Sequence, residues 1–87
     1  GQKIAIEVKS FIGASLLSEF HTAVGQFMNY RMALKEQDAE RILYLAVPKD
    51  TYKDFFTLEF GQIAIRHYQL KLIVYDVESE VIIKWQN

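Results

Sequence analysis

The chain has 87 residues, of which 51% are hydrophobic, and it carries a formal net charge of −1 with no cysteine. This length allows one domain with a single modest core, and the composition excludes an intrinsically disordered chain. The lack of cysteine excludes disulfides, thiolate zinc sites and a cysteine nucleophile.

The N-terminal region predicts a β-strand over residues 3–11, because apolar side chains alternate along it. This alternation places Glu7 and Lys9 together on one face, inside an otherwise apolar run. The chain begins without Met and enters this strand at once. We therefore expect it to be part of a longer polypeptide whose upstream elements cover the strand.

A long helix is predicted from Leu16 to about Glu36, because apolar residues recur at helical spacings along it. Ser15 or Ser18 can act as its N-cap, and Glu19 is well placed for the positive helix terminus. A near-continuous apolar run follows over residues 41–47 and is typical of a strand covered on both faces.

Pro48 is expected to close that second strand, because proline cannot donate a hydrogen bond to the ladder. Two short helices are predicted next, over residues 50–57 and 60–68, with Asp50 or Thr51 as cap of the first.

Two final strands, over residues 70–75 and 80–85, are joined by a polar turn and form a predicted hairpin. The order β-α-β-α-α-β-β predicts an α/β fold with a mixed sheet and flanking helices, in one domain over residues 1–87.

The Glu7-Val8-Lys9 segment has the spacing of a metal-dependent phosphodiesterase site. Hard cations such as Mg²⁺ take oxygen ligands, which the Glu7 carboxylate and the Val8 backbone carbonyl can supply. Lys9 on the same face can orient a water molecule or stabilise developing charge. A bare Glu-x-Lys is a weak motif, and an ordinary neighbouring ion pair is its simplest explanation.

A second group lies on the long helix. Gln26 and Tyr30 are four residues apart and therefore project from the same side. An amide and a phenol aligned in this way can contact a nucleotide or Lys9, or they can form a polar helix edge. A local basic surface could be formed by Lys49, Lys53, Arg66, Lys71 and Lys84. Because acids are interleaved with them, we expect a mixed solvated surface instead.

The strand motif followed by the helix motif resembles the PD-(D/E)XK nuclease superfamily, in particular the branch related to the RecB nuclease domain and Holliday-junction resolvases. The stretches GQKIAIEVKSFIGASLLSEFHTAVGQFMNYRMAL, ERILYLAVPKDTY and YQLKLIVYDVESEVIIKW resemble more specifically the XisH family. Its members are the cyanobacterial fdxN element excision controlling factors. This likeness covers essentially the whole chain.

The resemblance implies a restriction-endonuclease-like fold and a role in excising a DNA element, with DNA, a site-specific recombinase and a second Xis-type protein as partners. It makes Glu7 a metal ligand for Mg²⁺ or Mn²⁺, Lys9 the catalytic lysine, and Gln26 and Tyr30 supporting catalytic residues. The superfamily's other acidic residue would lie before Gly1. We therefore expect the 87 residues alone to be a poor nuclease.

Two other readings stay open. In the first, the fold serves as a non-catalytic module that binds DNA or the recombinase. In the second, the domain binds a partner, and Glu7 and Lys9 only neutralise each other. We also expect an uncovered edge and apolar face that favour association with another chain, including a second copy. No membrane-spanning run or signal peptide pattern is present, so a cytoplasmic location is expected.

Overall fold

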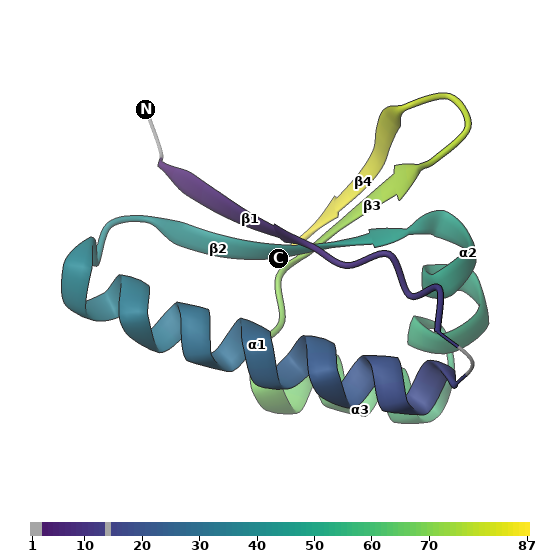
Figure 1. Cartoon of the computed structure of the whole chain (residues 1–87), viewed down its shortest axis with the longest axis horizontal. Coiled ribbons are helices and arrows are strands. Elements are labelled where there is room, and N and C mark those ends of the chain that lie inside the picture. Colours follow the sequence, from purple (N-terminus) through teal and green to yellow (C-terminus); the bar gives the residue numbers. More distant parts are fainter. Residues whose placement is uncertain (1–2, 14) are drawn as a thin grey trace.

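The computed structural model describes residues 3–13 and 15–87 and confirms the predicted order of elements (Figure 1). Its strands and helices are β1 (Ile4–Val8), α1 (Leu16–Gln37), β2 (Ile42–Pro48), α2 (Lys49–Thr51), η1 (Tyr52–Phe56), α3 (Glu59–Tyr68), β3 (Leu72–Asp76) and β4 (Val81–Gln86).

The four strands form one mixed sheet in the order β1-β2-β3-β4. β1, β2 and β3 are parallel, and β4 is antiparallel to β3. The prediction of a strand covered on both faces is confirmed, because the five residues from Leu43 to Val47 are all buried. The three parallel strands end at the same edge of the sheet, which we call the carboxyl edge.

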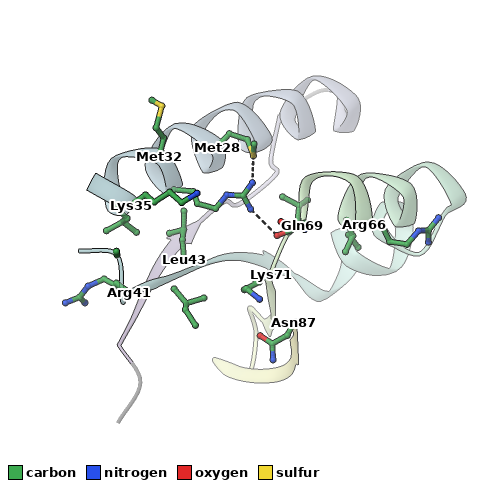
Figure 2. A pocket seen from close by; sticks show the side chains of 15 residues that line it. Met28, Met32, Lys35, Arg41, Leu43, Arg66, Gln69, Lys71 and Asn87 are labelled. Atoms are coloured by element: carbon green, nitrogen blue, oxygen red, sulfur yellow. Dashed lines mark hydrogen bonds between the residues drawn. The ribbon is translucent and has the colours of Figure 1, made fainter. Parts of the chain in front are cut away.

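α1 begins at Ser15, whose hydroxyl oxygen accepts a hydrogen bond from the Ser18 amide at 3.2 Å. This selects one of the two predicted caps. The buried face of α1 carries Phe20 and Phe27, which pack into the main core below the sheet. The C-terminal half of the helix borders an open cleft that also reaches Lys71 (Figure 2).

The segment after β2 differs from the predicted helix over residues 50–57. Its N-cap is Pro48, without a side-chain cap, so the prediction of Asp50 or Thr51 as cap was wrong. A single α-turn passes directly into the π-helix η1, in which the Thr57 amide donates to the Tyr52 carbonyl five residues back. Thr51 is buried instead of capping, and proline supplies the fixed extended backbone that precedes the turn.

α1 and α3 lie on the same side of the sheet (Figure 1). The main core fills the space between these helices and the sheet. The opposite face of the sheet has only a small buried cluster around Tyr44 and Ile73. Val8 and Trp85 remain 63% and 47% exposed. The expected open edge and uncovered apolar face are therefore present at β1 and on the side of the sheet away from the helices.

Candidate functional site

β1 positions Glu7 and Lys9 on the side of the sheet that faces the helices. Ala5, two residues before Glu7, packs against the main core, and side chains two apart along a strand share a face. Both Glu7 and Lys9 are partly buried. The predicted shared face is confirmed, and both residues lie at the carboxyl edge of the sheet.

The Val8 carbonyl faces the open side of β1. The Lys9 amide donates to the Ala46 carbonyl of β2 at 3.0 Å. In a trans peptide, the carbonyl of one residue points opposite to the amide of the next. The Val8 oxygen is therefore directed away from β2, toward the unpaired edge, where it is available as a ligand.

Glu19 is the residue at this site that the sequence analysis did not assign to it. Its Oε2 lies 3.3 Å from Lys9 Nζ, and its Oε1 accepts a hydrogen bond from the Gly13 amide at 2.8 Å. The side chains of Lys9 and Glu19 are each 21% exposed. Lys9 is therefore neutralised by a carboxylate from α1, and Glu19 ties the strand, the loop and the helix together.

A signal for this contact was present in the sequence. Glu19 lies in the first turn of the helix that follows the strand, and we interpreted it there only as a favourable charge at the helix terminus. The contact depends on the path of the intervening loop, in which Phe11 adopts a left-handed backbone with φ of 55° and buries its ring in the core. Strand alternation does not predict such a turn.

Gln26 and Tyr30 project from the same stripe of α1 as Glu19, because seven and eleven residues are close to two and three helical turns. Both are exposed. Within residues 3–13 and 15–87, neither side chain makes a hydrogen bond with another residue, and no contact joins them to Lys9. Gln26 lies about 10 Å beyond Glu19 along the helix axis, given a rise of about 1.5 Å per residue.

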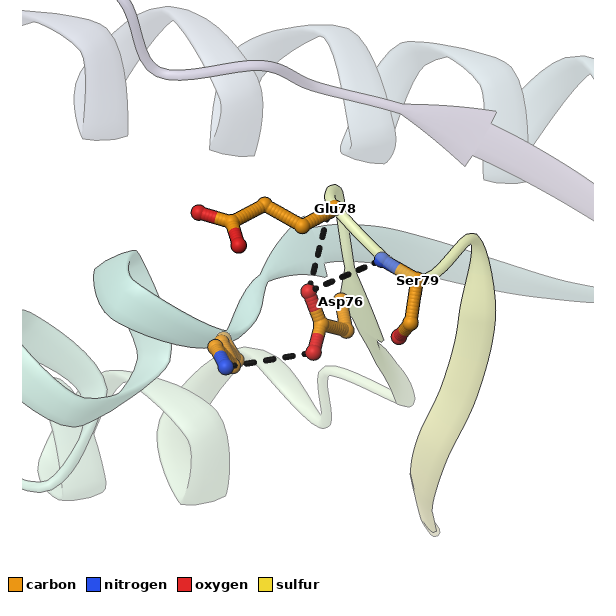
Figure 3. Close-up of polar contacts among 4 residues, drawn as sticks. Asp76, Glu78 and Ser79 are labelled. Atoms are coloured by element: carbon orange, nitrogen blue, oxygen red, sulfur yellow. Dashed lines mark hydrogen bonds and ion pairs between the residues drawn. The ribbon is translucent and has the colours of Figure 1, made fainter.

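A second ion pair stands at the carboxyl edge, beyond the ends of β2 and β3 (Figure 3). Lys49 Nζ lies 3.1 Å from Asp76 Oδ2, while Asp76 Oδ1 accepts hydrogen bonds from the Glu78 and Ser79 amides. The hydrogen bond with Lys49 lowers the pKa of Asp76, and the same bond raises the pKa of Lys49. The edge thus carries two cations, each already held by a carboxylate.

The residues at the end of β1 supply only some of the ligands that a divalent metal ion requires. Glu7 and the Val8 carbonyl are oxygen donors of the kind that Mg²⁺ prefers. Among residues 3–13 and 15–87, no group of three or more His, Asp or Glu side chains is placed to hold a metal ion. An ion at Glu7 would therefore complete its coordination with water and with phosphate oxygens of a bound substrate, which is common for Mg²⁺.

Comparison with known proteins decides the family. The model of the XisH protein family matches residues 1–83. The chain belongs to the XisH family. No match was found among curated proteins.

Two solved structures resemble this XisH-family chain over nearly its full length. An XisH family protein from Nostoc punctiforme is 58% identical, with a TM-score of 0.93, and the match covers 97% of this chain and 66% of that one. An fdxN element excision controlling factor protein from Anabaena variabilis is 59% identical, with a TM-score of 0.95, covering 100% and 68%. The chain thus spans about two thirds of the length of these relatives, and the predicted family likeness is confirmed.

In the part of the chain that the structure describes, none of the helices combines the length and the apolar character needed to cross a bilayer.

Proposed function

We propose that this XisH-family chain acts in controlling the site-specific excision of a DNA element, with Glu7 and Lys9 at the centre of a metal-dependent site for phosphodiester cleavage. The observation that carries the proposal is the geometry at the end of β1. Glu7 and Lys9 share one partly buried face, and the Val8 carbonyl points to the open edge beside them. The Anabaena variabilis relative is an fdxN element excision controlling factor protein, which supports the excision role.

Each residue of the site has a distinct part in this proposal. Glu7 and the Val8 carbonyl would hold Mg²⁺ or Mn²⁺, which supplies a polarised phosphate and an acidified water molecule when bound. Lys9 stabilises the negative charge that develops on the phosphate oxygens. Glu19 keeps the Lys9 ammonium oriented until a phosphate competes for it. Gln26 and Tyr30 would act only on parts of the substrate that lie along α1.

DNA, a site-specific recombinase and a second Xis-type protein are the partners that accompany this proposal. The name of the Anabaena relative refers to excision of the fdxN element, which supports DNA as a partner. The recombinase and the second Xis-type protein are proposed from the family resemblance alone. Because the relatives are longer by about a third of their length, a further acidic ligand from outside these 87 residues is compatible with the site.

The test is cleavage of branched and nicked DNA, in the presence of Mg²⁺ or Mn²⁺, by the longer polypeptide to which we expect these 87 residues to belong. Removing one charge-stabilising donor from such a site typically costs about 10²–10³ in rate. We expect Lys9→Ala to lower cleavage by about this factor, whereas Lys53→Ala, which removes an exposed cation from η1, leaves it unchanged. Cleavage that survives Lys9→Ala would remove Lys9 from the mechanism.

A second function is favoured by the Lys9–Glu19 ion pair, because a catalytic lysine held by a carboxylate is not free to act. In this alternative, the chain is a non-catalytic module that binds DNA or the recombinase. It predicts that neither Mg²⁺ nor Mn²⁺ produces any cleavage, and that Glu7→Gln leaves DNA binding intact. The same assay therefore separates the two functions.

A further inference from the structure

An open cleft of about 870 Å³ lies at the other end of α1 from Lys9. Its walls are the C-terminal half of α1, the beginning of β2 and the segment that links α3 to β3 (Figure 2). Five cationic side chains line it, namely Arg31, Lys35, Arg41, Arg66 and Lys71. Among the lining residues that the structure describes, none is acidic.

This gathering of charge is not a consequence of overall composition. The chain has ten lysine and arginine residues against eleven acidic ones, so half of all its cations surround one cleft. The cleft draws on elements far apart in sequence. Arg66 and Lys71 both line it, which favours the local basic surface over the mixed solvated surface that we expected for them.

Among the residues that the structure describes, most of these cations have no anionic partner. Arg41 is paired with Asp38 at 3.1 Å. Arg31 is held by neutral groups, since it donates to the Gln69 carbonyl at 3.1 Å and to the Met28 sulfur at 3.0 Å. Within residues 3–13 and 15–87, Lys35, Arg66 and Lys71 make no salt bridge.

The negative ends of the helix dipoles offset only part of the positive charge in the cleft. Both α1 and α3 end near the cleft, and Lys35 and Arg66 stand in their last turns. Each helix C-terminus contributes roughly half a negative charge. Together with Asp38, the two termini therefore offset about two of the five positive charges, which leaves about three to attract an anion.

We infer that this cleft binds consecutive phosphate groups of a DNA backbone. A volume of about 870 Å³ is much larger than one phosphate, and the cations come from several elements instead of converging on a single point. Apolar side chains such as Met28, Met32 and Leu34 make up most of the remaining lining, and none of the described lining residues is an aromatic that could stack on a base. Recognition of the backbone, independent of base sequence, is the interaction that such a lining supports.

The cleft and the Glu7–Lys9 site are well separated. Lys35 is sixteen residues beyond Glu19 on α1, which corresponds to about 24 Å along the axis. Binding at the cleft therefore requires neither a metal ion nor Glu7. The inference goes beyond the proposed cleavage function, and either one can fail without the other.

The test measures binding of a labelled 25-base-pair duplex of arbitrary sequence by fluorescence anisotropy, in EDTA, over a range of salt concentrations. The test variant is the double substitution Lys35→Gln with Lys71→Gln. The matched control is Lys53→Gln with Lys84→Gln, which removes the same charge from exposed positions on η1 and β4. Circular dichroism and thermal melting verify that both variants are folded.

Each lost phosphate contact reduces the slope of log affinity against log salt by about 1. We expect the cleft variant to lower the slope by about 2 and to weaken binding at least tenfold near 0.1 M salt, whereas the control changes neither by more than about twofold. The Glu7→Gln variant should bind the duplex with the same affinity and the same salt dependence as the unchanged chain. Equal weakening by the two double variants, or no measurable duplex binding by the unchanged chain, would overturn the inference.

Two further experiments test whether the ligand is DNA and not RNA or free phosphate. An RNA duplex of the same length should not bind more tightly than DNA, because a tighter complex with RNA would contradict the proposed ligand. Inorganic phosphate at the same phosphate concentration should fail to displace the duplex. Displacement at equal phosphate concentration would show a site for free phosphate and would also contradict the inference. An NMR titration of the unaltered chain with DNA provides a second measurement. The backbone amide signals of Arg31 and Lys71 should shift as the duplex binds.

Discussion

At the scale of single residues, the main result is that Lys9 is paired with Glu19 and not with Glu7. The shared face of Glu7 and Lys9 was predictable, since a strand has a strict period of two. The contact with Glu19 was not, because it requires the left-handed turn at Phe11 and the hydrogen bond between Gly13 and Glu19. Lys9 is therefore neutralised by Glu19 and not by Glu7, contrary to the part of the partner-binding hypothesis that pairs Glu7 with Lys9.

The other ion pair of the carboxyl edge gives a prediction for pH dependence. Because Lys49 lowers the pKa of Asp76, the pair stabilises the fold above about pH 4, and this contribution is lost as pH falls through the lowered pKa. The pKa of Lys49 is raised, so the contribution persists to about pH 10 and is lost as pH rises through that raised pKa.

We expect Lys49→Gln to raise the pKa of Asp76, as measured by carboxyl NMR titration. The return to the ordinary aspartate value should be incomplete, because the Glu78 and Ser79 amides still donate to the carboxylate. Lys53→Gln is the control, since Lys53 is exposed on the neighbouring turn. An unchanged Asp76 titration in Lys49→Gln would show that the pair does not form in solution.

At the scale of elements, α1 and β2 were predictable because each has a long and regular pattern of apolar residues. The segment over residues 49–58 was not, because a π-helix has no distinctive pattern in a five-residue stretch. The burial of both Phe55 and Phe56 depends on tertiary packing against α1 and α3, which local propensity does not encode. Gly61, near the start of α3, allows that helix to approach η1 closely.

Two glycines in helices give opposite predictions. A Cβ at Gly61 would collide with the Phe55 carbonyl oxygen and lie 2.7 Å from the Phe56 Cα, whereas a Cβ at Gly25 meets nothing within 4 Å. We expect Gly61→Ala to lower the free energy of unfolding by about 1–2 kcal/mol, since strain of about 1–3 kcal/mol exceeds the gain in helix propensity. Gly25→Ala should raise it by up to about 1 kcal/mol.

Urea denaturation of the two alanine variants measures both effects. Gly25→Ala is the matched control, because it adds the same methyl group to a helix at a solvent-exposed position without the close backbone contact that Gly61 has. Equal shifts in the same direction would mean that α3 does not pack against η1 as closely as the structure has it.

At the scale of the whole molecule, the proposed metal site lies at one end of α1 and a cationic cleft lies toward the other. The fold class was predictable from the sequence, because it rests on local patterns and on a family likeness that covers the chain, whereas the metal site on β1 stays a prediction. The cleft was not predictable, because its cations come from residues 31 to 71 and only folding brings them together.

The arrangement also places the proposed metal site beside the open edge of β1 and an uncovered sheet face. About a third of the length of each solved relative lies outside the match with this chain. Their additional length is sufficient for elements that complete such an edge, in agreement with the proposal that a further acidic ligand comes from outside these 87 residues. We therefore expect Glu7 and Val8 to bind a metal ion weakly, but at one defined position at the end of β1.

Titration of the ¹⁵N-labelled chain with Mn²⁺ tests the metal site most directly, because the paramagnetic ion broadens amide signals close to where it binds. We predict that broadening begins at Glu7, Val8 and Lys9, and that Glu7→Gln abolishes this local effect. The control Glu36→Gln, which removes an exposed carboxylate from α1, should leave it unchanged. Broadening that begins elsewhere, or that persists at β1 in Glu7→Gln, would contradict the assignment of Glu7 as the metal ligand.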